Sequence, residues 1–258
     1  MEIVDVPWTL TDGDFDLAAV RTACDGRRVD VIIPAQNEAP TIGAVIDAVA
    51  HHRSLIAEVI VVDDHSVDAT ASQAERHGAR VVTLRDATGK GEALAAGVAA
   101  SDAEIVVFMD GDVLNPGVEY VARMLQPLLQ RPDIHLVKGY YQRPLHDQSH
   151  GGGRVNELVA RPVLTLLYPG LDLIRQPLAG ETAIRRETLD ALDLASAYGV
   201  EIALLIDVAR KFGISSLAQV DLGVRRHRNR TLEELRPMAV EVLNVALGRY
   251  GVEAPISD

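Results

Sequence analysis

Residues 29–38 read VDVIIPAQNE, an apolar run rich in valine and isoleucine that ends in a polar cluster. The same order recurs in residues 59–66, VIVVDDHS, and in residues 105–112, IVVFMDGD. Such apolar runs are typical of strands that are buried on both faces of a parallel sheet. Ligands bind at the carboxyl ends of these strands, where the three polar clusters would meet. The three segments therefore predict an α/β protein with a binding site at one edge of its sheet.

Helical patterns alternate with the strand patterns along the chain, which favours a doubly wound α/β arrangement. In the first half we expect strands at Val29–Ile33, Val59–Val62, Arg80–Leu84 and Ile105–Met109, and helices at Thr41–His51, Ala69–His77 and Gly91–Ala100. In the second half we expect helices at Val118–Leu129, Val155–Tyr168, Gly199–Phe212 and Leu232–Tyr250, and strands at His135–Tyr140, Ala179–Ile184 and Ala218–Val224. Residues 1–28 are predicted to form an N-terminal arm, and residues 148–154 a mobile loop. The whole chain is expected to be one domain.

Composition excludes several other classes of protein. A chain of 258 residues that is 48% hydrophobic can bury one full core. Its net charge of −12 argues against binding to a nucleic-acid backbone. No stretch approaches the roughly 20 uninterrupted apolar residues that a membrane-spanning helix needs, and the acidic N-terminus is unlike a signal peptide. We therefore expect a cytoplasmic protein with no membrane partner, whose single cysteine, Cys24, cannot form an internal disulfide.

Two carboxylates flank a glycine in Asp110-Gly111-Asp112, directly after a predicted buried strand. Hard divalent cations such as Mg²⁺ or Mn²⁺ prefer carboxylate and phosphate oxygens, so this pair suits a metal ion that bridges a diphosphate. An Asp-x-Asp sequence by itself is also common in turns. Its place after the third strand of the series favours the metal site.

A local basic stretch, residues 225–230, reads RRHRNR inside an otherwise acidic chain. One interpretation is an anion-binding segment, which its position after a predicted strand favours. The other is a solvated basic face that pairs with nearby acids such as Glu233 and Glu234.

Taken together, these residues resemble the GT-A glycosyltransferases, and the chain is most similar to the actinobacterial glucosyl-3-phosphoglycerate synthases. The broad resemblance rests on the three strand-end clusters. The narrower one rests on residues 89–94 GKGEAL, 151–155 GGGRV, 176–181 QPLAGE, 198–202 YGVEI and 222–230 LGVRRHRNR. The resemblance implies a GT-A fold with a Rossmann-like nucleotide-sugar-binding half, residues 29–112, and a mixed-sheet acceptor-binding half with a C-terminal helix, residues 113–258.

The resemblance implies that the donor is a UDP-sugar, UDP-glucose in this family. The implied donor-binding residues are Pro34, Ala35, Gln36, Glu38, Asp64, Lys90, Asp110, Gly111, Asp112 and Glu201. The first four would hold the uridine and ribose, Asp64 would reach the uracil edge, and Lys90 would reach a phosphate or the uracil. Local sequence alone leaves two other readings open: Asn37-Glu38 as a helix cap, and Lys90 as a loop lysine in solvent.

The resemblance also implies a catalytic set of Asp112, Glu201 and Arg225, and a metal site formed by Asp112 and His227 with Mg²⁺ or Mn²⁺. Glu201 would hydrogen-bond hydroxyls of the sugar, although an acid at a helix start is also favoured by the helix dipole. Transfer with retention of anomeric configuration is implied by the family alone. A homodimer is likewise implied by the family.

The implied acceptor is 3-phosphoglycerate, bound by Arg154, Asn156 and Asn229. A guanidinium binds phosphate and carboxylate bidentately, and the glycines before Arg154 expose backbone amides that could also face an anion. The sequence departs from the family pattern at Asn156, where threonine is usual, and at Gln36 and Ile184. Another donor such as GDP-mannose, another phosphorylated or carboxylated acceptor, and a nucleotide-binding scaffold without turnover are the alternatives.

Overall fold

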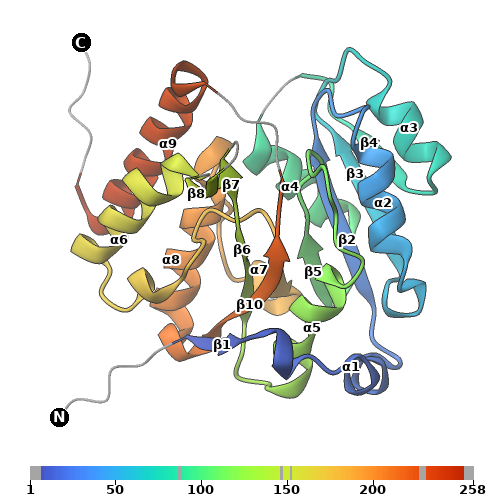
Figure 1. Cartoon of the computed structure of the whole chain (residues 1–258), viewed down its shortest axis with the longest axis horizontal. Helices are drawn as coiled ribbons and strands as arrows, with labels where there is room; N and C mark the ends of the chain where they lie inside the picture. The colour runs from blue at the N-terminus through green and yellow to red at the C-terminus, as the bar shows by residue number, and fades with distance from the viewer. Residues whose placement is uncertain (1–6, 87–88, 146–147, 152, 227–230, 253–258) are drawn as a thin grey trace.

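A sheet of eight strands in the order β1-β10-β6-β9-β5-β2-β3-β4 crosses the molecule in a computed structural model (Figure 1). The structure describes residues 7–86, 89–145, 148–151, 153–226 and 231–252. The strands of the sheet are β1 Trp8–Leu10, β2 Val29–Ala35, β3 Glu58–Asp63, β4 Arg80–Thr83, β5 Ile105–Phe108, β6 Leu136–Gln142, β9 Thr182–Arg185 and β10 Leu217–Val224. The short strands β7 Pro144–Leu145 and β8 Gln148–Gly151 pair with each other outside it.

All strand pairs of this sheet are parallel except those made by β9, which runs antiparallel to both β5 and β6. The order β5-β2-β3-β4 comes from one continuous stretch of chain, as the alternating pattern predicts. In the other half, β9 separates β5 from β6, and β10 lies between β6 and β1. The predicted combination of a Rossmann-like half and a mixed-sheet half is therefore confirmed.

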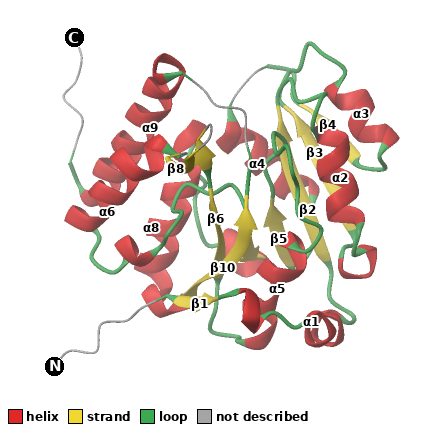
Figure 2. Cartoon of the chain, in the orientation of Figure 1, coloured by secondary structure: helices red, strands yellow, loops and turns green. Residues whose placement is uncertain are grey.

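Helices cover both faces of the sheet (Figure 2). One face carries α1 Leu17–Cys24, α2 Ile42–Ala50, α3 Thr70–Arg76 and α5 Tyr120–Gln130. The opposite face carries α4 Lys90–Ala100, α6 Arg161–Leu167, α8 Val200–Phe212 and α9 Leu232–Tyr250. The remaining helical elements are α7 Arg186–Leu189, η1 Asp12–Asp14, η2 Arg53–Leu55, η3 Asn156–Ala160, η4 Leu171–Leu173, η5 Ala197–Gly199 and η6 Ile214–Ser216.

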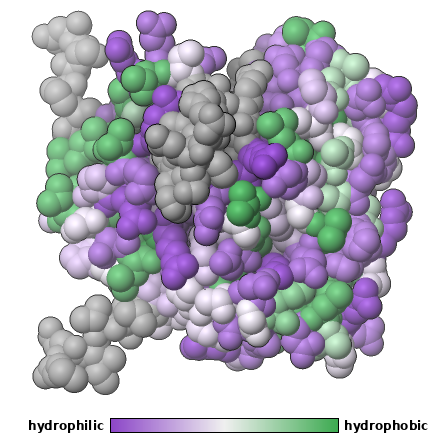
Figure 3. All heavy atoms as spheres, in the orientation of Figure 1, coloured by the Kyte–Doolittle hydropathy of each residue, from purple (hydrophilic) through white to green (hydrophobic). Residues whose placement is uncertain are grey.

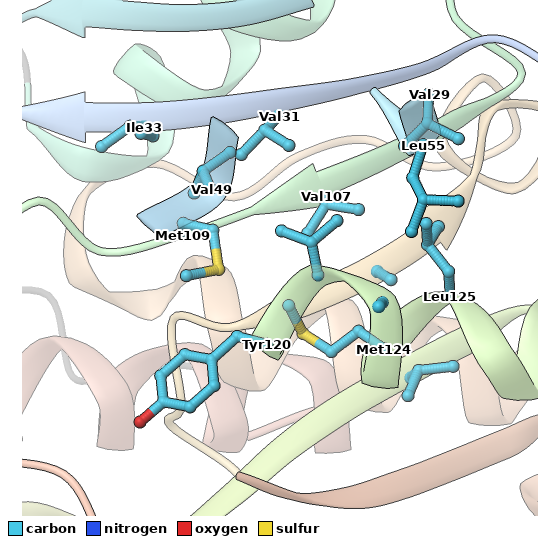
Figure 4. Packing of buried hydrophobic residues seen from close by; sticks show 14 of the residues in the cluster. Val29, Val31, Ile33, Val49, Leu55, Val107, Met109, Tyr120, Met124 and Leu125 are labelled. Carbon is cyan, nitrogen blue, oxygen red and sulfur yellow. The ribbon is translucent and has the colours of Figure 1, made fainter. Parts of the chain in front are cut away.

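Alternating side chains of the central strands fill two separate cores. Val31 and Ile33 of β2 pack with Val107 and Met124 on the α5 side (Figure 4). Ile32, between them, packs on the opposite side with residues of α4 and α8. Because side chains of a strand alternate between faces, a strand between two helical layers must be apolar at nearly every position. This explains the uninterrupted apolar runs in the sequence.

Two expectations for irregular segments are wrong. Residues 8–24 are no loose arm: β1 pairs with β10 at the edge of the sheet, and Asp16 caps α1 by accepting hydrogen bonds from Ala18 and Ala19. The predicted loop of residues 148–154 contains strand β8, and residue 152 lies outside the described residues. Both segments gain order from pairing with distant or neighbouring strands, which a periodicity argument does not detect.

Candidate active site

The three strand-end clusters meet at one edge of the sheet and line a cavity of about 250 Å³. All ten predicted donor-binding residues line it: Pro34, Ala35, Gln36, Glu38, Asp64, Lys90, Asp110, Gly111, Asp112 and Glu201. Arg154 and Asn156, predicted for the acceptor, line it as well. His227 and Asn229 lie outside the described residues. The parallel order of β5, β2 and β3 explains the convergence, because their carboxyl ends point to the same edge.

Asp64 organises one end of this cavity. It follows β3 and is buried, and its Oδ2 accepts a hydrogen bond of 3.0 Å from the backbone N–H of Gly89. Its carbonyl oxygen accepts a hydrogen bond of 2.9 Å from Nε2 of Gln36. These contacts fix the ends of β2 and β3 against the segment that begins α4. The end of the cavity predicted to receive the base is therefore built from three different loops.

Asn37 and Glu38 do not cap the following helix. The N-cap residue of α2 is Thr41, whose hydroxyl donates to the carbonyl of Gly111 at 2.7 Å. Asn37 adopts a left-handed conformation with φ of 58°, and its side-chain oxygen accepts from the N–H of Val67 at 2.9 Å. The cap reading is thus wrong, and Glu38 is left facing the cavity.

Lys90 joins the two halves of the site. It is the first residue of α4, and its Nζ lies 2.6 Å from Oδ1 of Asp110 and 2.5 Å from Oε1 of Glu201. Burial alone would lower the pKa of Lys90, but the Asp110 and Glu201 carboxylates raise it above its usual range. The reading of Lys90 as a solvent-exposed loop lysine is wrong. Lys90 instead carries a positive charge between one carboxylate from each half.

Arg225 lies behind the two aspartates and is fully buried. Its Nη2 donates to Oδ2 of Asp110 at 2.9 Å and lies 3.8 Å from Oδ1 of Asp112. Its Nη1 contacts Oε2 of Glu181 and donates to the Tyr141 hydroxyl at 3.1 Å. Burial lowers the pKa of Arg225, and the neighbouring carboxylates, Glu181 first, raise it further than burial lowers it. For Arg225 the solvated-face reading of the basic stretch is therefore wrong.

Two buried ionisable side chains, Lys138 and Glu181, lie beneath the site, and sequence reasoning gave no role to Lys138. Lys138 on β6 contacts the Ala179 carbonyl and donates to the Thr182 hydroxyl at 2.9 Å, and burial lowers its pKa to about 8. Burial raises the pKa of Glu181, and the adjacent Arg225 opposes this effect. The signal for Lys138 was a lone lysine inside an apolar strand, LVKGYY at residues 136–141, since an ammonium is seldom buried without a partner.

Asp112 is the described residue best placed to hold a divalent cation. Its side chain is 31% exposed and lines the cavity, whereas both oxygens of Asp110 are bound by Lys90 and Arg225. No cluster of three or more His, Cys, Asp or Glu side chains with metal-site geometry occurs within the described parts of the chain. A single carboxylate fits Mg²⁺ or Mn²⁺ where phosphate oxygens and waters complete the coordination. The donor chemistry therefore fits the predicted metal.

Asn156 sits at the start of the π-helical segment η3 and is buried. Its Oδ1 accepts from the N–H of Leu178 at 3.4 Å, and its Nδ2 donates to Glu157 at 2.9 Å. The side-chain amide of Asn156 thereby connects the segment that precedes β9 to the segment that follows Arg154. Further cavity-lining residues without a predicted role are Ala93, Tyr141, Arg143, Val155, Gln176, Leu178, Tyr198, Leu235 and Met238.

Both the sequence and the fold of this chain match known proteins. The model described as "Glycosyl transferase family 2" matches residues 30–162, more than half of the chain. The chain belongs to this glycosyltransferase family. It is 45% identical over 251 residues to the glucosyl-3-phosphoglycerate synthase of Mycolicibacterium paratuberculosis, covering 92% of this chain and 76% of that protein. It is 42% identical to the glucosyl-3-phosphoglycerate synthase of Petrotoga mobilis, covering 86% of this chain and 73% of that protein.

Solved structures of this glycosyltransferase family lead to the same group. The crystal structure of glucosyl-3-phosphoglycerate synthase from Mycobacterium tuberculosis with Mn²⁺, UDP-glucose and phosphoglyceric acid has a TM-score of 0.90 and 42% sequence identity, covering 98% of this chain and 90% of that chain. Another crystal structure of that enzyme contains Mg²⁺ and UDP, with a TM-score of 0.89 and 42% identity, covering 96% and 88%. The predicted GT-A fold and the predicted resemblance are confirmed. Among the described helices, none has the length and apolar character of a membrane span.

Proposed function

We propose that this chain transfers glucose from UDP-glucose to 3-phosphoglycerate, giving glucosyl-3-phosphoglycerate in a metal-dependent reaction with retention of configuration. One observation carries the proposal. Twelve residues predicted from family resemblance for donor and acceptor come from both halves of the chain, and they line a single cavity. The similarity to synthases of this product supports the same donor and acceptor. The complete set of charged side chains argues against a scaffold without turnover.

Each side chain then has a role that its position supports. Asp112 would hold a divalent cation with the two phosphates, and the metal when bound would neutralise charge on the departing UDP. Lys90, held between Asp110 and Glu201, supplies a fixed positive charge beside the same phosphates. The second oxygen of Glu201, Oε2, is buried and has no hydrogen-bond partner within the described residues. That oxygen can accept a hydrogen bond from a sugar hydroxyl.

The direct test measures UDP release from UDP-glucose with Mg²⁺, with and without 3-phosphoglycerate. We expect strong stimulation by 3-phosphoglycerate in the wild type and its loss in Asp112→Ala. Asp193→Ala changes an exposed aspartate and is the matched control, which should keep wild-type activity. A product assay by mass spectrometry identifies glucosyl-3-phosphoglycerate, and NMR of its anomeric proton tests retention.

Other outcomes would redirect the assignment. Release of GDP from GDP-mannose, with no turnover of UDP-glucose, would replace the donor. Binding of UDP-glucose without stimulation by 3-phosphoglycerate would leave the donor assignment in place and replace the acceptor. Binding of UDP-glucose with no turnover for any acid tried would favour the scaffold.

The proposal includes a cytoplasmic homodimer, as the family resemblance implies. An apolar patch supports self-association: Leu158 of η3 is 73% exposed and Leu166 of α6 is 78% exposed. The edge of the molecule at which Figure 1 places α6 is coloured green in Figure 3. Large exposed apolar side chains that lie together favour a protein interface. Light scattering of the wild type and of Leu166→Glu tests this, since a dimer formed through this patch should dissociate in the variant.

A further inference from the structure

Arg143 lines the cavity, although the family resemblance gave it no role. It follows directly after Gln142, the last residue of β6, and therefore comes from a different segment than Arg154. Its side chain lies against Gly153. A Cβ atom added at Gly153 would be 3.6 Å from Cδ of Arg143 and 3.8 Å from its Nη1. Because Gly153 immediately precedes Arg154, two arginines from separate segments reach the same part of the cavity.

The charges of the cavity are divided between two sides. The strand ends supply the carboxylates Glu38, Asp64, Asp110 and Asp112, and Lys90 is paired with Asp110 and Glu201. The residue after β6 and the residue after Gly153 supply the two guanidinium groups, Arg143 and Arg154. The carboxylate side suits a metal ion and a diphosphate, whereas the guanidinium side suits a second ligand that is itself anionic.

Arg143 makes no hydrogen bond or ion pair with another residue in the described part of the chain. A guanidinium has five donors in a planar fork that matches a carboxylate or a phosphate. In a cavity, such a group gains most from a bidentate anionic partner. Its partner is therefore to be sought in the bound molecule.

We propose that Arg143 binds the carboxylate of the acceptor while Arg154 binds its phosphate, so that the site selects small acceptors that carry both anionic groups. The inference rests on the proposed function. Arg154 takes the phosphate because the backbone amide of the preceding Gly153, which also lines the cavity, adds a donor for a group with three oxygens. Arg143 supplies side-chain donors only, which suffice for the two oxygens of a carboxylate. One guanidinium for each anionic group sets the acceptor's orientation and brings its hydroxyl toward the donor.

The test compares Arg143→Gln with Arg154→Gln on three acids: 3-phosphoglycerate, glycerol 3-phosphate, which lacks the carboxylate, and glycerate, which lacks the phosphate. KM is measured for 3-phosphoglycerate by UDP release. The other two compounds are measured as competitive inhibitors against 3-phosphoglycerate. Arg21→Gln, which changes an exposed arginine of α1 outside the cavity, is the matched control. Circular dichroism and KM for UDP-glucose show whether the fold and the donor end are intact.

In Arg143→Gln we expect KM for 3-phosphoglycerate to rise about 10- to 100-fold, because the variant loses a charge-assisted pair of hydrogen bonds to the carboxylate. The inhibition constant of glycerol 3-phosphate should change less than about twofold, since that compound has no carboxylate to lose. Arg154→Gln should give the converse pattern: the inhibition constant of glycerol 3-phosphate rises and that of glycerate stays the same. Arg143→Lys, which retains the charge, should recover part of the loss.

Three results would overturn the inference. An unchanged KM in Arg143→Gln would remove Arg143 from the acceptor site. Equal weakening of 3-phosphoglycerate and glycerol 3-phosphate would assign Arg143 to the phosphate. A rise in KM for UDP-glucose by the same factor would assign it to the donor or to the fold. A wild-type protein that is not stimulated by 3-phosphoglycerate would instead refute the proposed function, so the two failures are distinguishable.

Discussion

The two halves of the molecule differ in how the chain builds them. Residues 29–112 form four neighbouring parallel strands from one continuous stretch, and each polar cluster lies where its own strand ends. The rest of the sheet combines β6, β9 and β10 with β1 from the N-terminal region, and β9 is reversed. The edge that we propose binds the donor can thus follow from local order, whereas the side that we propose binds the acceptor depends on pairings between distant segments.

Buried charges join the two halves. Arg225, from the second half, is bound to Asp110 of the first, and Lys90 of the first is bound to Glu201 of the second. A buried ion that loses its partner destabilises a fold far more than an exposed one does, because its desolvation is no longer compensated. The dependence of each half on the other can therefore be tested by changing the residues that connect them.

The largest effect is expected for Arg225→Met. The change leaves Asp110 and Glu181 without their shared cation in a buried position, so the free energy of unfolding should fall by about 3–5 kcal/mol. Affinity for Mg²⁺ with UDP should fall as well, since Asp112 loses a neighbour that orients it. Denaturant unfolding and calorimetric titration measure the two quantities. Arg226→Met, at the exposed next position, is the control. Equal unfolding free energies for the two variants would show that the halves do not depend on this connection.

Lys138→Met tests the buried charge of Lys138 through the pH dependence of the free energy of unfolding. Below about pH 8 the Lys138 ammonium is charged in both states, and its burial destabilises the folded protein. Between pH 8 and the ordinary pKa of 10.5, only the unfolded chain retains the proton, so the wild type is stabilised as the pH rises. The wild type should gain up to about 3 kcal/mol relative to Lys138→Met across this range.

Unfolding by denaturant at several pH values between 7 and 10 measures this difference. Lys211→Met replaces a lysine near the surface, on α8, and should show no comparable change with pH relative to the wild type. A constant difference between wild type and Lys138→Met over the whole range would mean that the pKa of Lys138 is the same in both states.

Gly180→Ala tests the contact between the two halves of the chain. A Cβ atom at Gly180, in the second half, would overlap the Asp110 carboxylate, so Asp110 must move. Displacement of an active-site group by about 1 Å can lower turnover about 100-fold, and we expect kcat/KM to fall by about that factor. Gly248→Ala, on α9 and away from the cavity, is the matched control. The change there places the added Cβ atom in open space, with nothing within 4 Å, and the activity of this variant should match that of the wild type. Similar losses in both variants would contradict this assignment.

Sequence reasoning succeeded where a signal is local and failed where it is not. The strands of residues 29–112 were predicted because full burial requires nearly continuous apolar runs, and their polar ends predicted a binding site at one edge of the sheet. The individual donor-side residues were implied by the family resemblance. Strand β1 escaped prediction because three residues at an edge carry no periodicity, and its order comes from β10, more than 200 positions away. Lys138 and Glu181 likewise acquire their significance only from neighbours that the fold supplies.

The acceptor side contains one local signal, and it gives the smallest predicted effect. Helix α9 begins with a capping box in which the Thr231 hydroxyl accepts from the N–H of Glu234, while Glu234 accepts from the N–H of Thr231. The start of α9 at Leu232 agrees with the predicted helix, and the helix carries Leu235 and Met238 to the cavity. Thr231→Ala should lower the free energy of unfolding by about 1 kcal/mol, and Thr231→Ser, which keeps the hydroxyl, by much less. Since the cap orders only the first turn, kcat should change little. A loss of activity as large as that of Gly180→Ala would mean that the start of α9 takes part in positioning substrate, and that the acceptor half, too, is controlled by local sequence.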